Sequence, residues 1–369
     1  MQALSITRVA LINVIVGLCM FELTLRVQQK LGPLVDLDFG GQNSMIELSD
    51  ELNHIPVPGE NWDSNGFRRM AEPDSAQCSQ RLLFMGDSFM QGIQRTSDGD
   101  IVTSRSADTV PAHARRYFKE SLSKELCVFN AGVASYSPSI FVPQAKKLIP
   151  LVKPDIVVID VDETDLWDDY YRYRELVTRE ADGSIAAVRP TPVYVQFHLG
   201  LVASTSKPLY VHRVFSKLYF TRVEYPKILA HYNESRPGDN LMLAKLPAAE
   251  ALEKYGSAIE YFKITLEDLT QTVTTRMSTP DGLIYIHHPH LGHVSTAGVV
   301  LNNLVSDALR DVASRYKVKY YDATEDLKTK FENTPEKYYI SNDVHFNAGG
   351  TRAYGIAVAK YLARALGNN

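Results

Sequence analysis

The sequence has no surplus of basic residues and no basic run. Lysine and arginine together number 39 against 43 aspartates and glutamates, and the formal net charge is -4. A nucleic-acid surface needs a basic patch, and so does a polybasic contact with a membrane. We therefore expect no nucleic-acid partner.

The chain also lacks internal repeats and low-complexity tracts. Its 369 residues are 45% hydrophobic, a composition that excludes intrinsic disorder and can bury a large core. We expect one principal globular domain.

Cysteine is scarce, with three in the whole chain. Cys19 lies in an apolar N-terminal segment, while Cys78 and Cys127 each fall at the start of a candidate strand. The latter two could pair in an oxidising compartment. We expect instead two free buried thiols, the more common state of an isolated buried cysteine.

An apolar run from Val9 to Phe21 is bounded by Arg8 and Glu22. Counted on to Leu25, it approaches the roughly 20 residues that span a bilayer. No small-x-small cleavage site follows it, and Cys19 lacks the small preceding residue that lipoprotein processing requires.

We expect an uncleaved signal anchor over residues 1–28, which crosses the inner (cytoplasmic) membrane once. The main domain then faces the periplasm or the cell exterior. The basic residues on both sides of the run leave the orientation open. The alternatives are a signal peptide and a buried N-terminal helix of a soluble protein.

Residues 29–80 form a polar, turn-rich connecting region, with a surface loop expected over Val57–Phe67. From residue 81 onward, short apolar runs rich in β-formers alternate with amphipathic segments, which predicts a parallel sheet covered on both faces. The expected strands are Arg81–Gly86, Leu126–Gly132, Asp155–Asp162, Gly282–His288 and Val318–Ala323, and the expected helices are Ala249–Met277, Thr296–Tyr316 and Ala348–Leu366.

An aromatic interval over about residues 172–247 interrupts this alternation after the third strand. Such an insertion can serve as a lid or as a wall on which sugars stack. We prefer the simpler interpretation that its rings form a small core of their own.

Ligands gather at the carboxyl ends of parallel strands. The first strand leads into "GDSFMQG", which places Ser88 at a strand-to-helix turn beside free helix N–H groups. The second leads into "NAGVASYSP", where Gly132 can offer a backbone N–H. "SNDVHFNAGG" then places Asp343 and His345 two residues apart before the last helix. A nucleophilic serine needs a base, and that histidine needs an orienting carboxylate.

The segments "FMGDSFMQG", "FNAGVASYSP" and "NDVHFNAGG" resemble, in this order, blocks I, II and V of the SGNH/GDSL esterases and acyltransferases. An apolar N-terminal helix is found in many envelope-anchored members. The resemblance implies a flavodoxin-like three-layer α/β/α sandwich over residues 81–369. It implies Ser88 as nucleophile, His345 as general base and Asp343 as its partner, with no metal or other cofactor.

By the same resemblance, the amides of Ser88 and Gly132 are oxyanion donors, and the substrates are acyl esters, often acetyl groups on polysaccharides. Block III usually supplies an Asn-Asp pair, but here Thr164 precedes Asp165. Asn130 is a candidate for the missing amide. Asp87 and His288 complete the expected substrate-binding residues.

Two other functional classes remain open. "DVDET", with Asp160, Asp162 and Thr164, resembles the D-x-D-x-T motif of Mg²⁺-dependent haloacid-dehalogenase-type phosphatases. The later strand ends do not supply the other residues of that family, so the order of motifs argues against it. The missing block III asparagine also motivates a non-catalytic envelope protein that keeps the fold as a binding surface.

The segment "HHPHLGH" contains His287, His288, His290 and His293. Imidazoles at short spacing suit Zn²⁺, but this spacing matches no common zinc pattern. We therefore expect no metal, and expect His288 to form hydrogen bonds with substrate.

Overall fold

The computed structural model describes residues 2–31, 46–70, 78–95, 101–103, 106–234, 241–295, 301–331, 334–341 and 343–367. The chain divides into two compact units. The first consists of Met1–Leu48 and Pro190–Arg236, and the second of Ser49–Arg189 and Pro237–Asn369. The domain boundaries expected from sequence stay a prediction.

The second unit contains a five-stranded parallel sheet with the order β11-β10-β7-β3-β6. In chain order of these five strands the arrangement is 2-1-3-4-5, the flavodoxin-like order. All five predicted strands are present. They are β3 (Gln80–Met85), β6 (Leu126–Asn130), β7 (Ile156–Val161), β10 (Leu283–His287) and β11 (Lys319–Asp322).

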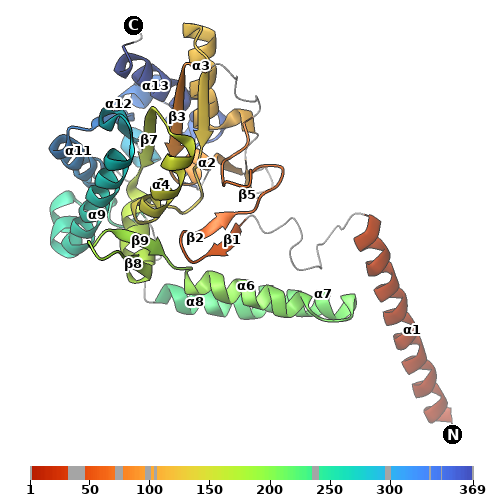
Figure 1. The fold of residues 1–369 in the computed structure, drawn as a ribbon. Coiled ribbons are helices and arrows are strands. Elements are labelled where there is room, and N and C mark those ends of the chain that lie inside the picture. The colour runs from red at the N-terminus through yellow and green to blue at the C-terminus, as the bar shows by residue number, and fades with distance from the viewer. Residues whose placement is uncertain are drawn as a thin grey trace. The chain divides into compact units, whose positions relative to one another are not determined.

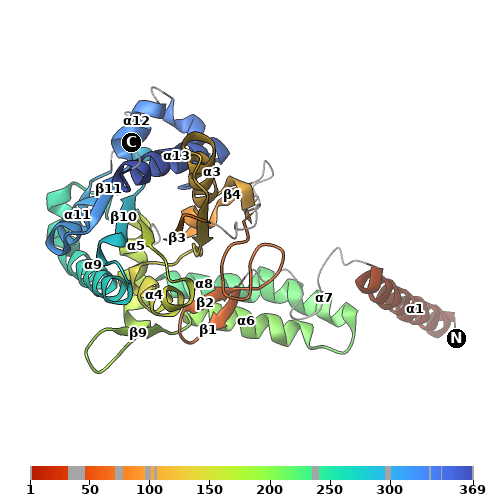
Figure 2. The same cartoon turned by 45° about the horizontal axis from the view of Figure 1, so that its top comes forward.

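Alternate side chains of the strands pack on opposite faces of the sheet. Leu83 and Met85 contact the cluster that includes α4 (Pro138–Val152), α9 (Ala248–Arg276) and α11 (Leu304–Tyr316). Leu82 and Phe84 contact the cluster that includes α3 (Val110–Leu122) and α13 (Ala348–Ala365). Figures 1 and 2 show these two groups of helices on either side of the strands. The expected three-layer sandwich is confirmed.

Two predicted helices are matched closely by α9 and α13, while α11 begins later than expected. Residues 301–303 are not helical, and residues 296–300 lie outside the described part. Smaller elements complete this unit: β2 (Asn53–Pro56), α2 (Ser88–Gln91), β4 (Ile93–Arg95), β5 (Ile101–Thr103), α5 (Glu163–Trp167), β8 (Val177–Arg179), β9 (Ile185–Val188), α10 (Leu291–Val294) and α12 (Thr324–Phe331). Short 3₁₀ or π turns occur at Ser106–Asp108, Asp168–Tyr173, Arg174–Leu176, Pro280–Gly282 and Pro335–Tyr338.

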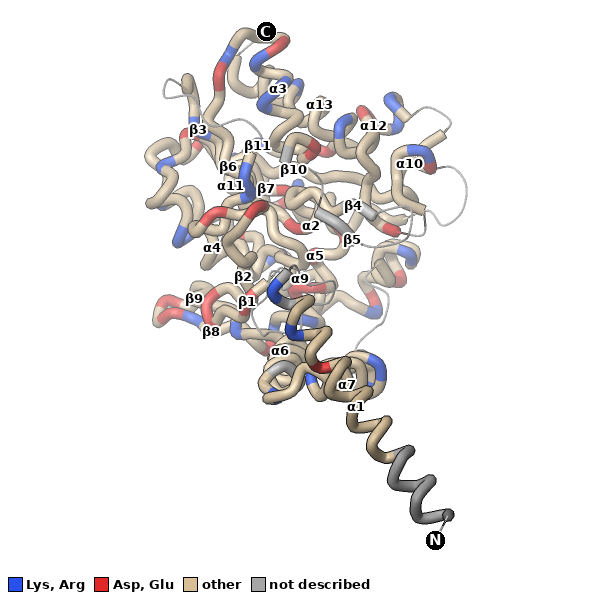
Figure 3. The backbone as a smooth tube through the Cα atoms, turned by 90° about the vertical axis from the view of Figure 1, so that its right-hand side faces the viewer, with Lys and Arg blue, Asp and Glu red and all other residues tan. Residues whose placement is uncertain are grey.

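Acidic and basic residues are interspersed along the backbone (Figure 3). Neither sign gathers into a stripe on the side of the described chain shown there. This distribution agrees with the small net charge of the sequence.

The first unit contains the apolar helix α1 (Gln2–Leu31) and the helices of the insertion. Within α1, Leu11–Gln28 has a mean hydropathy of 1.5 and is long and apolar enough to cross a membrane. A signal sequence meets the same criterion, so the helix fits both an anchor and a signal peptide. The strand β1 (Ile46–Ser49) follows the segment 32–45, which lies outside the described residues.

The insertion forms α6 (Pro192–Thr205), α7 (Tyr210–Tyr219) and α8 (Tyr225–Glu234), with a π turn over Phe220–Glu224. The ring of Phe197 lies 6.0 Å from that of Phe220 and 4.6 Å from that of Tyr225. These contacts are what a small core belonging to the insertion would make.

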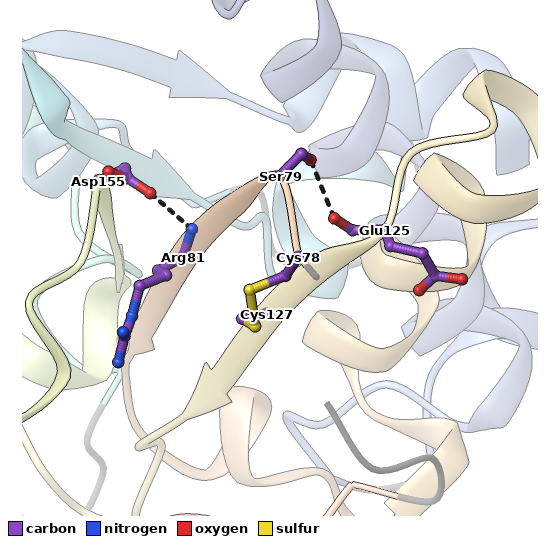
Figure 4. Close-up of a disulfide and its surroundings, with 6 residues drawn as sticks. All are labelled: Cys78, Ser79, Arg81, Glu125, Cys127 and Asp155. Carbon is purple, nitrogen blue, oxygen red and sulfur yellow. Dashed lines mark hydrogen bonds between the residues drawn. A yellow bond between two sulfur atoms is a disulfide. The ribbon is translucent and has the colours of Figure 1, made fainter. Parts of the chain in front are cut away.

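A disulfide joins Cys78 to Cys127, with 5.3 Å between their Cα atoms (Figure 4). The expectation of two free thiols is wrong, because β3 and β6 are neighbours in the sheet and Arg81 pairs with Cys127 in their register. Beside the disulfide, the hydroxyl of Ser79 donates to the carbonyl of Glu125 (2.9 Å). The chain continues into β3, where the N–H of Arg81 donates to Asp155 (2.8 Å).

Candidate active site

A tight turn after β3 positions Ser88. A Cβ on Gly86 would lie 2.5 Å from Cγ of Met90, so only glycine allows the chain to pass so close to α2. The side chain of Asp87 caps α2 by accepting a hydrogen bond from the N–H of Phe89 (2.8 Å). Ser88 is thereby fixed as the first residue of a short helix and is largely buried.

The structure brings Ser88, His345 and Asp343 together. Oγ of Ser88 lies 2.8 Å from Nε2 of His345, and Nδ1 of His345 forms a short hydrogen bond with Oδ1 of Asp343. The same Asp343 oxygen accepts the backbone N–H of His345 (3.0 Å). Because Nδ1–H donates to the carboxylate, Nε2 is the nitrogen free to accept a proton from Ser88.

Asp87 also faces the Ser88 hydroxyl, at 3.1 Å from Oδ2. Burial, together with the negative charge of Asp162, raises the pKa of the Asp87 carboxyl to about 6. Near neutral pH two acceptors, Asp87 and His345, therefore compete for the single hydroxyl proton of Ser88.

The expected oxyanion donors are mostly engaged elsewhere. The N–H of Gly132 donates to Oδ1 of Asn130 (3.0 Å), while Nδ2 of Asn130 donates to the carbonyl of Met90 (2.8 Å). Asn130 thus ties the loop after β6 to α2, and this geometry does not support the oxyanion role expected of either residue. The N–H of Ser88 has no acceptor among the described residues.

Thr164 is also engaged. Its hydroxyl donates to Oδ1 of Asp162 (2.7 Å), and its N–H donates to the same oxygen (2.8 Å). Oδ2 of Asp165 accepts the N–H of Asp162 (2.9 Å), which completes a capping box at the start of α5. The expected donor and substrate-binding roles of Thr164 and Asp165 are therefore unsupported by this geometry.

Burial raises the pKa of the Asp165 carboxyl well above its usual range, and the negative charge of Asp162 adds to this. This shift favours the protonated form of Asp165. Its role here is to hold the first turn of α5.

His288 is 1% exposed, so the expected contact with substrate is also unsupported. Its Nδ1 lies 2.9 Å from Oδ2 of Asp160, whose other oxygen accepts the hydroxyl of Tyr354 (2.7 Å). Both oxygens of Asp160 are therefore occupied and buried. The same geometry argues against Asp160 as a phosphatase nucleophile.

Phe89 packs against two histidines of the site, which the sequence did not predict. Its ring centroid lies 3.8 Å from that of His288 and 4.9 Å from that of His345. It thus packs against the back of the imidazole next to Ser88 and limits its rotation. The only sequence signal is an aromatic residue directly after the serine, and nothing there indicates which rings it would meet.

No family model matches the chain, and no curated protein matches it. Among solved structures, the chain is similar to an acetylxylan esterase from Geobacillus stearothermophilus, with 12% identity, a TM-score of 0.43, and coverage of 79% of this chain and 95% of the other. It is similar to a lipase/acylhydrolase from Enterococcus faecalis, with 12% identity, a TM-score of 0.42, and coverage of 77% and 95%.

It is also similar to LAE5, an α/β hydrolase enzyme from the metagenome of Lake Arreo, Spain, with 14% identity, a TM-score of 0.43, and coverage of 79% and 96%. These likenesses are too distant to carry an argument about chemistry. The strand order of the sheet identifies the fold, and the positions of the side chains indicate the chemistry.

Proposed function

We propose that this protein is a serine esterase or acyltransferase, and one observation carries the proposal. The Ser88 hydroxyl lies within hydrogen-bonding distance of the only unengaged nitrogen of a histidine whose other nitrogen contacts Asp343. Ser88 attacks the ester carbonyl while His345 takes its proton, and His345 then returns the proton to the leaving alcohol. An acyl-Ser88 intermediate remains.

The intermediate is resolved when His345 removes a proton from a second hydroxyl compound, which attacks the acyl carbon. The bond between that carbon and Oγ of Ser88 breaks, and His345 returns the proton to Ser88. Water gives hydrolysis, and a sugar hydroxyl gives acyl transfer. The N–H of Ser88 is the donor that stabilises the developing oxyanion, because the other expected donors are engaged.

The substrate class is an acyl ester, and we propose acetyl groups of an envelope polysaccharide or another acylated molecule. The resemblance of the Ser88, Gly132 and His345 segments to SGNH/GDSL enzymes supports this choice. No organic cofactor takes part in the acyl transfer itself.

We propose that the second unit works outside the cytoplasm and that α1 anchors the chain in the inner membrane. The Cys78–Cys127 disulfide supports export, because such bonds persist in oxidising compartments. The apolar segment Leu11–Gln28 supports an anchor.

The test is mass spectrometry of purified full-length protein after incubation with an aryl acetate. We expect an adduct of about 42 Da, one acetyl replacing one hydrogen, on the peptide that contains Ser88. Ser88→Ala should abolish it. Ser121→Ala, at an exposed position of α3, is the matched control and should retain it. Labelling that persists in Ser88→Ala would contradict the proposal.

A non-catalytic binding protein is the second candidate, favoured by the engagement of Gly132, Asn130 and Thr164. It predicts folded protein in which Ser88 stays unlabelled by a fluorophosphonate probe during prolonged incubation. Labelling at Ser88 would rule it out.

A further inference from the structure

A second cluster of side chains lies where β7 and β10 run side by side. The register pairs Asp160 with Ile286 and Val161 with His287, so the residues after both strands emerge together. One potential ligand atom each from Asp162, His288 and His290 lies within 4.8 Å of the other two. Nε2 of His288 and Nε2 of His290 lie 3.1 and 2.9 Å from the same Asp162 oxygen.

We propose that Asp162, His288 and His290 bind a divalent transition-metal ion, with Zn²⁺ the best match and Glu163 the fourth ligand. Two imidazoles and two carboxylates form a donor set that Zn²⁺ accepts. Ligand atoms about 2.1 Å from a tetrahedral zinc ion are separated by roughly 3.4 Å. The two nitrogen-to-oxygen distances at Asp162, 3.1 and 2.9 Å, are shorter than this value, so these ligand atoms would move apart by a few tenths of an ångström on binding the ion.

Unsatisfied buried atoms support the proposal. Oε2 of Glu163 is buried and forms no hydrogen bond with any described residue, and the buried Nε2 of His288 lies 3.1 Å from an Asp162 oxygen without the geometry of a hydrogen bond. Oε2 of Glu163 lies 3.5 Å from Nε2 of His290. Orphaned buried polar atoms are rare, because a buried polar group that has lost its water and gained no partner destabilises the fold. Here they point into one cluster, which a shared cation would complete.

The surrounding residues hold the His288 imidazole in the orientation that a metal site needs. Nδ1 of His288 contacts Asp160, which accepts the Tyr354 hydroxyl, and Oε1 of Glu163 lies 3.0 Å from Nε2 of His287. A carboxylate on the far nitrogen is the usual outer partner of a metal-bound histidine, because it fixes the tautomer and the ring orientation.

The balance of charge also favours a cation. The side chains of Asp160, Asp162 and Glu163 are each at most 1% exposed, and each has a histidine nitrogen within 3.5 Å that compensates its charge only when that imidazole is protonated. A divalent ion at the mouth of β7 would offset two of these charges.

The site is closed, so its role is structural. All four proposed ligands are buried, which leaves no open position for substrate. The ring of Phe89 contacts the rings of both His288 and His345. The ion would fix the loops after β7 and β10, and the inference stands whether or not Ser88 is a nucleophile. It goes against the expectation of no metal drawn from sequence.

The test measures metal by inductively coupled plasma mass spectrometry in full-length protein from zinc-supplemented cells. We expect about one zinc per chain in the wild type and in Ser88→Ala. Asp162→Asn, which keeps the helix cap, and His290→Asn should lose it. His113→Asn, at a buried histidine of α3 outside the cluster, is the control and should keep it.

Two measurements on the wild type guard against variants that do not fold. Chelator should lower the Tm, and Zn²⁺ but not Mg²⁺ should restore it. The Co²⁺-substituted protein should show the visible spectrum of four-coordinate cobalt. A metal-free wild type whose Tm responds to neither chelator nor Zn²⁺ would overturn the proposal. So would folded Asp162→Asn and His290→Asn proteins that retain full zinc.

Discussion

Oγ1 of Thr164 donates a hydrogen bond to Oδ1 of Asp162 over 2.7 Å. The hydroxyl of this residue, which was expected to face the oxyanion, therefore binds the side chain that caps α5. A threonine hydroxyl has one hydrogen to donate. The Thr164 hydroxyl, which stands where block III usually has an asparagine amide, therefore stabilises the start of α5.

Thr164→Ala should consequently change the rate of acyl transfer by less than about threefold, whereas removal of a true oxyanion donor costs roughly 10²–10³-fold. It should lower the free energy of unfolding by about 1 kcal/mol, because a buried hydrogen bond is lost. Kinetics with an aryl acetate and urea unfolding measure the two effects. Thr164→Ser, which keeps the hydroxyl, is the control. A loss of activity near 10²-fold with unchanged stability would assign Thr164 to the oxyanion site.

Asp343→Asn should reduce acyl transfer by about 10³–10⁴-fold, because an amide favours the wrong tautomer of His345. The fold should survive, since an asparagine oxygen can still accept the backbone N–H of His345. Steady-state kinetics and circular dichroism test this, with Asp50→Asn at an exposed position as the control. Activity within tenfold of wild type would argue against Asp343 as the orienting group.

Asp168 should make the protein less stable as the pH rises. Burial raises the pKa of its carboxyl from an ordinary value of 3.8 to about 7, although the charge of Arg172 opposes the shift. The folded state then holds a proton that the unfolded state has lost, so this contribution to stability is complete below about pH 4 and is lost as the pH rises to about 7.

The upper limit of that loss is about 4 kcal/mol, from roughly three pKa units at 1.36 kcal/mol each. Asp168→Asn should remove most of it. Urea unfolding at pH 5 and pH 8 measures the difference between variant and wild type, and Asp50→Asn again serves as control. If the difference in the free energy of unfolding between Asp168→Asn and the wild type is the same at pH 8 as at pH 5, the assignment is contradicted.

The Cys78–Cys127 disulfide closes a loop with a sequence separation of 49 residues. The chain-entropy model gives a stabilisation of about 4 kcal/mol for a loop of that length. The double variant Cys78→Ser/Cys127→Ser should lower the free energy of unfolding by up to that amount. Guanidinium titration measures it, with Cys19→Ser as the control. An unchanged midpoint would show that the bond adds nothing to stability.

The oxidation state of the same two cysteines indicates the cellular compartment in which the second unit lies. If the second unit is exported, thiol trapping in intact cells should find Cys78 and Cys127 oxidised, because the cytosol keeps thiols reduced. Alkylation before and after reduction, followed by mass spectrometry, distinguishes the states. Reduced Cys78 and Cys127 in living cells would place the domain in the cytoplasm.

The alternation of apolar runs and amphipathic segments located all five strands of the sheet and two major helices within a few residues. Each of these signals is local, because side-chain burial in a parallel strand or on a helix repeats within a few residues. The same local patterns placed Ser88 and His345 at loops leaving the sandwich. Sequence alone thus determined the fold class and which residues could reach a common edge.

Tertiary structure decided which side chains meet. No local pattern encodes which strands are neighbours in the sheet. The pairing of β3 with β6 brings Cys78 to Cys127, and the pairing of β7 with β10 brings Asp162 to His290. A donor such as the Gly132 N–H has one hydrogen, and its acceptor depends on which group lies nearest after packing. Partners distant in sequence are selected by strand order and close packing, so they appear only once the chain has folded.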